Sequence, residues 1–93
     1  MNEKHIEQKL VTEVKKTDGL CIKFISPSMA GIPDRLVLLP NGKIGFVEVK
    51  ANGQKPRAIQ TKRITHLEKL GFKCFVLDDV VKIGGIIHAI QST

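Results

Sequence analysis

Residues 31–50 read GIPDRLVLLPNGKIGFVEVK, and this stretch decides the fold because it holds two apolar runs around a short turn. The runs 34–39 and 43–51 are rich in Val, Leu and Ile, which favours β-strands. Pro-Asn-Gly at 40–42 suits a three-residue loop. Pro takes the first central position of a type I turn, Asn the second, and Gly the left-handed position that closes it with a bulge. The stretch therefore predicts an antiparallel hairpin.

The predicted loop length determines which residues face each other. It pairs Leu39 with Lys43, and counting back along both strands places Asp34 opposite Glu48. Opposed residues point to the same face with Cβ atoms roughly 5 Å apart. Lys50 joins that face because strand side chains alternate. A two-residue turn would shift the pairing by one and separate the acids, so their convergence depends on the three-residue loop.

An acid, acid and lysine set on one sheet face points to metal-assisted chemistry. Two facing carboxylates repel each other, and Mg²⁺ binds one or two carboxylates together with water and phosphate oxygens. Such an ion polarises a phosphoryl group and lowers the pKa of bound water. A neighbouring lysine can orient or deprotonate the attacking water, or neutralise developing charge. Asp34, Glu48 and Lys50 therefore predict phosphodiester hydrolysis.

A simpler explanation exists for each of these residues. Asp34 after Pro33 is a common start of a strand, and Glu48 and Lys50 fit the polar outer face of an amphipathic strand. Phe46 shares their face, however, which makes that face partly apolar. Because Asp34, Glu48 and Lys50 occur together on one hairpin, a shared metal site is favoured over a separate explanation for each residue.

The rest of the chain predicts helices around the hairpin. The apolar spacing of Ile6, Leu10 and Val14 indicates a first helix. The expected elements are a helix at 3–17 ended by Asp18-Gly19, a strand at 20–26, a loop at 27–33, a helix from Pro56 to Gly71, a strand at 73–77 and a last helix at 80–90. Gly84-Gly85 weakens that helix and leaves a strand pair as its alternative. The order α-β-β-β-α-β-α predicts an α/β (α+β) fold with a mixed four-stranded sheet.

Two polar residues fall on otherwise apolar helix faces. Glu7 shares the face of Leu10 and Val14, where an acid is costly unless it is paired. It is either a third metal-facing carboxylate or a boundary residue whose tip reaches water. Gln60 precedes Ile64 by four residues, near a helix N-terminus that favours anions. It either orients phosphate or water, or is a satisfied structural amide.

Composition and charge narrow the class of function. The 93 residues form a single domain spanning 1–93, too small for a second. The net charge of +6 and pI of about 9.6 favour a polyanion such as nucleic acid. No acid occurs between Glu48 and Glu68. Besides Lys50, that interval holds the candidate DNA-binding residues Lys55, Arg57, Lys62 and Arg63. The competing explanation is a solvated helix face.

Several classes are excluded by what the chain lacks. With no Trp or Tyr and four Phe, a platform that stacks bases on aromatics is not expected. Two cysteines and three scattered histidines do not form a tetrahedral zinc cluster. No apolar stretch approaches the roughly 20 residues of a membrane span, and no signal segment follows Met1. We expect no membrane association and a cytoplasmic location, in a bacterial cell or a phage-infected host.

The motifs Gly31-Ile32-Pro33-Asp34 and Glu48-Val49-Lys50 resemble those of the PD-(D/E)XK nucleases. Glu7 in the first helix and Gln60 on the second narrow the resemblance to a VRR-NUC domain over nearly the whole chain. The resemblance implies a restriction-endonuclease-like core and Mg²⁺ or Mn²⁺ bound by Glu7, Asp34, Glu48 and the backbone carbonyl of Val49. It also implies that Lys50 is the catalytic lysine and Gln60 an accessory active-site residue.

The chain is similar to stand-alone VRR-NUC members, which resemble Holliday junction resolvases that work as homodimers. The expected function is therefore a homodimeric endodeoxyribonuclease acting on branched DNA, in particular the four-way junction. A twofold-symmetric dimer presents two related sites, which matches a substrate that needs paired cuts. The alternatives are a nicking or flap endonuclease without junction preference, and a basic nucleic-acid-binding module without chemistry. A protein–protein adaptor has no feature of the sequence in its favour.

Overall fold

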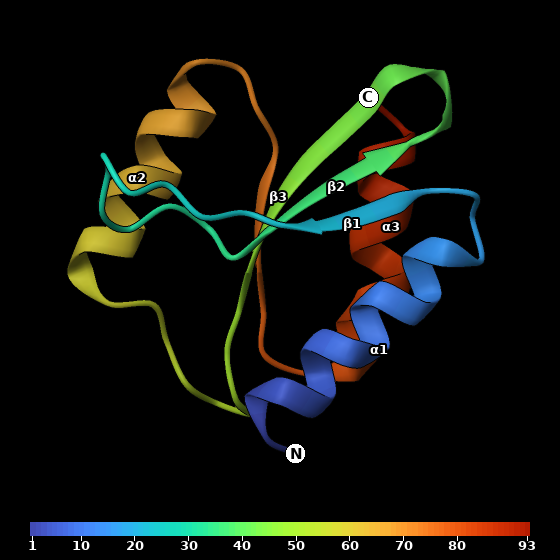
Figure 1. Cartoon of the computed structure of the whole chain (residues 1–93), viewed down its shortest axis with the longest axis horizontal. Coiled ribbons are helices and arrows are strands. Elements are labelled where there is room, and N and C mark those ends of the chain that lie inside the picture. Colours follow the sequence, from blue (N-terminus) through green and yellow to red (C-terminus); the bar gives the residue numbers. More distant parts are fainter.

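The computed structural model describes residues 1–93 and shows a four-stranded sheet flanked by three helices (Figure 1). The elements are α1 (Glu3–Lys15), β1 (Leu20–Lys23), β2 (Arg35–Leu39), β3 (Lys43–Val49), α2 (Ala58–Lys69), β4 (Cys74–Leu77) and α3 (Ile83–Gln91), with short 3₁₀ turns η1 (Pro40–Gly42) and η2 (Val80–Lys82). The predicted order of helices and strands is confirmed. No helix has both the length and the apolar character that crossing a membrane requires.

The sheet is mixed, with spatial order β1-β2-β3-β4. The first three strands are antiparallel neighbours, and β4 runs parallel to β3. A parallel pair needs a crossover connection, which α2 supplies. Helices α1 and α3 cover one face of the sheet, and α2 stands apart from them beyond the strands (Figure 1).

One apolar core lies between the sheet and the helices α1 and α3. Alternate residues of the strands, such as Val37, Val47 and Val49, point toward these helices and are fully buried. Ile6, Leu10 and Val14 of α1 meet them at the predicted spacing. The last helix is also confirmed, and the strand pair considered around Gly84-Gly85 is wrong.

The hairpin has the predicted register and a different turn conformation. Leu39 pairs with Lys43 and Arg35 with Val47, which confirms the three-residue loop. Asn41, however, has a positive φ of 70°, as does Gly42 with 72°. A type I turn requires a negative φ at its second central position, so the type I prediction is wrong. Asn tolerates a positive φ better than most residues.

Several predicted boundaries also need correction. Helix α1 stops at Lys15, and Asp18 rather than Gly19 takes the left-handed conformation, with φ 60°. Gly19 is needed for close contact, since a Cβ there would lie 2.6 Å from Leu39 Cδ2. Strand β1 ends at Lys23, three residues early. Pro56 precedes the N-cap of α2 and is not its first helical residue.

Candidate active site

The open end of the hairpin places Asp34 beside β3. Asp34 lies one residue before β2, and its carbonyl accepts a 2.7 Å hydrogen bond from the Phe24 N–H, which continues the ladder with β1. Its carboxylate Oδ2 accepts a 3.0 Å hydrogen bond from the Val49 N–H. The side chain is therefore held against the backbone of the Glu48-Val49-Lys50 segment, as the register predicts.

Glu48 is a buried carboxylate, with 1% of its surface exposed. Its Oε2 accepts a 2.9 Å hydrogen bond from Gln60 Nε2 and lies 3.3 Å from Lys50 Nζ. The other oxygen, Oε1, is buried and has no hydrogen-bond partner. The polar outer face considered for this strand is thus wrong for Glu48, and an unpartnered buried carboxylate oxygen is costly.

The electrostatics of Glu48 favour a cation. Burial and, to a lesser extent, the negative charge of Asp34 raise the pKa of Glu48 to about 7, against the opposing effect of Lys50. Two acids that disfavour each other's ionisation are relieved when a divalent ion lies between them. Asp34, Glu48 and the orphan oxygen Oε1 therefore have the donor chemistry that Mg²⁺ or Mn²⁺ prefers.

Gln60 connects the site to α2. Its Oε1 accepts a 2.8 Å hydrogen bond from the Arg57 N–H at the helix start, while its Nε2 donates to Glu48. The side chain is 6% exposed and the one buried residue of α2. Of the two predicted roles, the structure shows an amide that satisfies the helix N-terminus and holds a site carboxylate at the same time.

We expect Gln60→Ala to destabilise the metal-free protein by about 1–2 kcal/mol, because it removes the helix cap and a buried hydrogen bond. Urea unfolding followed by circular dichroism measures the change. Gln54→Ala is the matched control, since Gln54 is exposed in the loop before α2. Equal stability of the two variants would contradict the role of Gln60.

Glu7 pairs with Arg35, which is not one of the predicted site residues. Its Oε2 accepts a 2.8 Å hydrogen bond from Arg35 Nε, and the guanidinium also donates to the Cys21 carbonyl. Arg35 follows Asp34 in an alternating strand, so it points to the α1 side of the sheet while Asp34 points to the other. No group of three or more His, Cys, Asp or Glu side chains is placed to hold a metal ion. Glu7 as a third ligand stays a prediction.

The basic residues gather around the start of α2. Lys55, Arg57 and Lys62 are exposed, as contact with DNA requires. Arg63 is half-buried, and its Nε donates a 2.8 Å hydrogen bond to the Ala30 carbonyl in the loop that leads to Asp34. The pairings of Arg63 with Ala30 and of Arg35 with Glu7 were not predicted. Strand alternation alone could have indicated that Arg35 points toward α1.

The loop before Asp34 is also held by a glycine. Gly31 has a positive φ of 82°, and a Cβ there would lie 2.6 Å from the carbonyl oxygen of Ile59 in α2. Any larger residue would push the loop from the helix. The Gly-Ile-Pro-Asp segment therefore docks directly on α2, beside Gln60.

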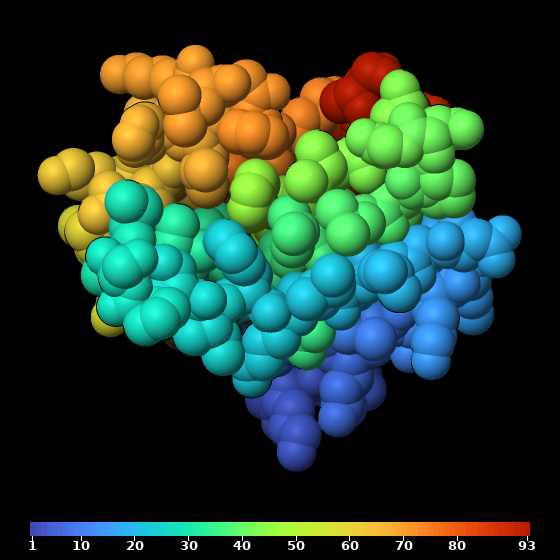
Figure 2. Space-filling view, turned by 45° about the horizontal axis from the view of Figure 1, so that its top comes forward, coloured from blue at the N-terminus to red at the C-terminus, as the bar shows by residue number.

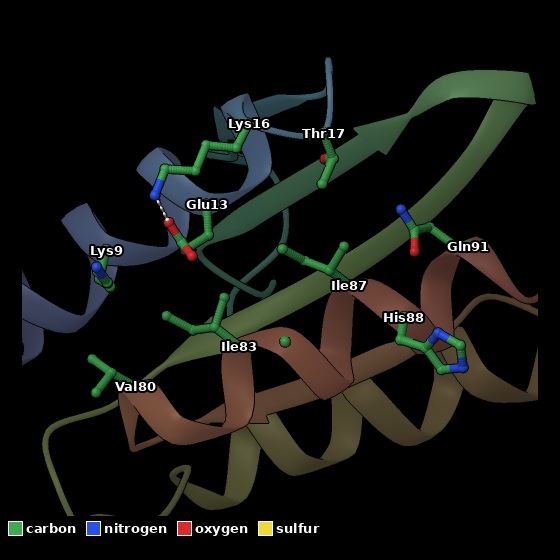
Figure 3. A pocket seen from close by; sticks show the side chains of 10 residues that line it. Lys9, Glu13, Lys16, Thr17, Val80, Ile83, Ile87, His88 and Gln91 are labelled. Atoms are coloured by element: carbon green, nitrogen blue, oxygen red, sulfur yellow. Dashed lines mark ion pairs between the residues drawn. The ribbon is translucent and has the colours of Figure 1, made fainter.

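A separate hollow lies between α1 and α3, on the side of the sheet away from Asp34 and Glu48 (Figure 3). Its floor is apolar, with Ile83 and Ile87, and its rim holds Lys9 and the ion pair of Lys16 with Glu13 at 2.9 Å. None of the predicted site residues lines it. The hollow therefore does not belong to the candidate active site.

Comparisons with known proteins agree with this arrangement. The chain is 51% identical over 78 residues to "Putative nuclease p44" of Acyrthosiphon pisum secondary endosymbiont phage 1, an alignment covering 84% of each protein. It is similar to a solved structure described as a "VRR_NUC domain", with a TM-score of 0.86, 29% identity and coverage of 92% of this chain and 94% of the other. No protein-family model matches the chain.

Proposed function

The chain belongs to the VRR-NUC family of nucleases, and from this premise we propose that it is a metal-dependent DNA endonuclease that resolves four-way junctions as a homodimer. The observation that carries the proposal is the buried Glu48 carboxylate beside Asp34, with one oxygen unpartnered and Lys50 at 3.3 Å from the other. A DNA-binding module without chemistry has no use for two acids at a surface that must accept phosphate.

Asp34 and Glu48 would hold Mg²⁺ or Mn²⁺ together with the Val49 backbone carbonyl. Glu7 would join them if its carboxylate left Arg35 and bound the ion instead. When bound, the ion supplies Lewis-acid stabilisation of charge on the scissile phosphate. Lys50 Nζ would orient the attacking water, or neutralise charge that develops in the transition state. Its position 3.3 Å from Glu48 keeps the ammonium at the site.

Gln60 acts as a positioning residue in this proposal. Because it bonds both Glu48 and the Arg57 backbone, it aligns the carboxylate with the start of α2. The exposed Lys55, Arg57 and Lys62 lie near the start of α2, where backbone N–H groups add to the attraction for phosphate. The DNA backbone would therefore enter across α2 toward Glu48.

The junction substrate follows from symmetry. One site cuts one strand, whereas a dimer with twofold symmetry presents two equivalent sites. A four-way junction has the same symmetry, so two sites can make paired cuts. A nicking or flap endonuclease is the second candidate, because Asp34, Glu48 and Lys50 would perform the same hydrolysis on any strand.

The test is cleavage of a labelled four-way junction with Mg²⁺ or Mn²⁺, against linear duplex and flap substrates. We expect paired cuts in the junction by the wild type and none by Asp34→Ala. Asp18→Asn is the matched control, since Asp18 is exposed after α1, far along the chain from the site, and Asn tolerates its positive φ of 60°. It should cut as the wild type does.

Each other outcome identifies an alternative. Equal cleavage of all substrates would keep the nuclease and remove the junction selectivity. Cleavage by Asp34→Ala would contradict the assignment of Asp34 to the active site. Metal-independent DNA binding without cleavage by folded wild type would favour the binding module.

A further inference from the structure

The outer face of α2 carries a row of basic side chains that extends beyond the proposed active site. Lys62, His66 and Lys69 follow one another at intervals of four and three residues, which places them on one side of the helix. All three are exposed. Together with Arg63 and Thr65 they line a hollow of about 340 Å³. We call Lys62, His66 and Lys69 the outer row.

The lysines of the outer row have no acidic partner. None of the four ion pairs in the chain includes Lys62 or Lys69. Glu68, the one acid of α2, does not line the hollow. On α1, by contrast, Lys16 pairs with Glu13 at 2.9 Å, as on an ordinary solvated helix face. Uncompensated positive charge along one side of a helix attracts a polyanion.

A position near the helix end does not account for the outer row. Cations in the last turn stabilise a helix through its dipole, which explains His66 and Lys69 in part. Lys62 lies in the first half of α2, where the dipole does not favour a cation. Because all three line one hollow, the outer row points to a ligand outside the chain.

The outer row faces away from the active site. Gln60, whose side chain is buried against Glu48, lies about 160° around the helix axis from Lys62. His66 and Lys69 lie about 9 Å and about 14 Å further along the axis than Gln60. A helix about 10 Å across therefore stands between the site carboxylate and the outer row.

The helix is also placed where a second ligand can reach it. Figure 1 shows α2 apart from α1 and α3. Figure 2 shows α2, in yellow and orange, at the margin of the molecule beside the blue-green loop that precedes Asp34. One side of α2 thus holds the site carboxylate through Gln60, and the opposite side is open to solvent.

We propose that the outer row binds the phosphates of a second arm of branched DNA, while the strand that is cut lies at Asp34 and Glu48. The inference rests on the proposed function, because it requires a substrate with more than one arm. Lysine ammonium groups bind phosphate oxygens, and a histidine ring N–H can donate to them. From Lys62 to Lys69 the row is about 10 Å long, the length of about three nucleotides of one strand.

Contacts between α2 and the loop before Asp34 fix the outer row relative to the active site. Arg63 borders the hollow, and its Nε donates a 2.8 Å hydrogen bond to the Ala30 carbonyl. Gly31 of the same loop packs against Ile59 of α2. Two arms held at the active site and at the outer row would therefore have a defined angle between them. A linear duplex has one arm and cannot fill both surfaces in this way.

The test is the salt dependence of DNA binding, measured by fluorescence anisotropy at pH 8 on a four-way junction and on a linear duplex as long as one arm. Ca²⁺, which carboxylates also bind, replaces Mg²⁺, and a denaturing gel establishes that the DNA stays intact. For Lys69→Gln we expect the slope of log K against log salt to decrease by about 0.9 on the junction, the value for one lost phosphate contact. The slope on the duplex should stay that of the wild type.

The controls separate the contact from net charge. Lys15→Gln removes the same charge from the last turn of α1, on the far side of the sheet, and should keep the wild-type slope. Lys69→Arg keeps the charge and should also keep the slope. Both glutamine variants retain good helix formers, and thermal unfolding establishes that they are folded.

Three results would overturn the inference. They are an unchanged junction slope for Lys69→Gln, an equal decrease on junction and duplex, and an equal decrease for Lys15→Gln. An equal decrease on both substrates would place the outer row on the arm that is cut. Cleavage of DNA with Mg²⁺ by the wild type, together with an unchanged slope for Lys69→Gln, would keep the nuclease and remove the second-arm surface. The expected slopes from a wild type that cuts no substrate would do the reverse.

Discussion

The Glu48→Gln variant is expected to lose DNA cleavage and to be more stable than the wild type in the absence of metal. The loss should be roughly a thousandfold or more, because Lewis-acid stabilisation is worth several kcal/mol and each 1.36 kcal/mol is tenfold in rate. The gain in stability arises because glutamine has nearly the same shape without the buried charge. It can still accept a hydrogen bond from Gln60 through its amide oxygen.

The pH dependence of this gain has a definite sign. The pKa of Glu48 is raised from an ordinary 4.5 to about 7 in the fold. Between these values the folded protein binds more protons than the unfolded chain, so stability decreases as pH rises. The wild type therefore retains its full stability below about pH 4.5 and loses part of it by about pH 7. At pH 8 we expect Glu48→Gln to be more stable by about 3 kcal/mol.

Urea unfolding at pH 5 and pH 8 with EDTA measures the difference. The two proteins should differ less at pH 5 than at pH 8. Adding Mg²⁺ or Mn²⁺ should stabilise the wild type and leave Glu48→Gln nearly unchanged, because ligand binding shifts the folding equilibrium. Glu68→Gln, at an exposed position of α2, is the control. If Glu48→Gln were less stable than the wild type at pH 8, this would contradict the conclusion that the charged form of Glu48 is unfavourable in the metal-free protein.

The Lys50→Met variant is expected to lose activity and to keep its metal. Cleavage should fall by about a hundredfold to ten-thousandfold, the range for removal of a positioned acid–base group. The Lys50 side chain is 15% exposed and close to Glu48, so methionine fills much of the same space. Since Asp34 and Glu48 are unchanged, stabilisation of the protein by Mg²⁺ or Mn²⁺ should persist.

Single-turnover cleavage rates and thermal unfolding with and without metal give the two readouts. Lys55→Met is the matched control, because Lys55 is exposed five residues further along. It should reduce DNA affinity and its salt dependence without the same loss of the single-turnover rate. If Lys50→Met cuts at the wild-type rate under saturating DNA, lysine has no role in the chemistry.

The hairpin and its pair of acids were predictable because they depend on local rules. A loop of three residues can join two strands in one register, and strand alternation then places Asp34, Glu48 and Lys50 on one face. Neither rule needs knowledge of the rest of the chain. The helices were also predictable from their apolar spacing, with errors of two or three residues at their ends, where competing caps such as Asp18 and Gly19 are nearly equivalent.

The partner of each polar side chain depended on elements distant in the sequence. Whether Glu7 faces Asp34 or Arg35 depends on how α1 crosses the sheet. In the structure Glu7 faces Arg35 and accepts its hydrogen bond. The hydrogen bond from Gln60 to Glu48 requires α2 to dock on the hairpin, 12 residues away in sequence. The face of β1 with Leu20 and Ile22 was predictable, and its exposure was not. Alternation determines the direction in which a side chain points, but only the arrangement of helices in three dimensions determines what, if anything, covers it.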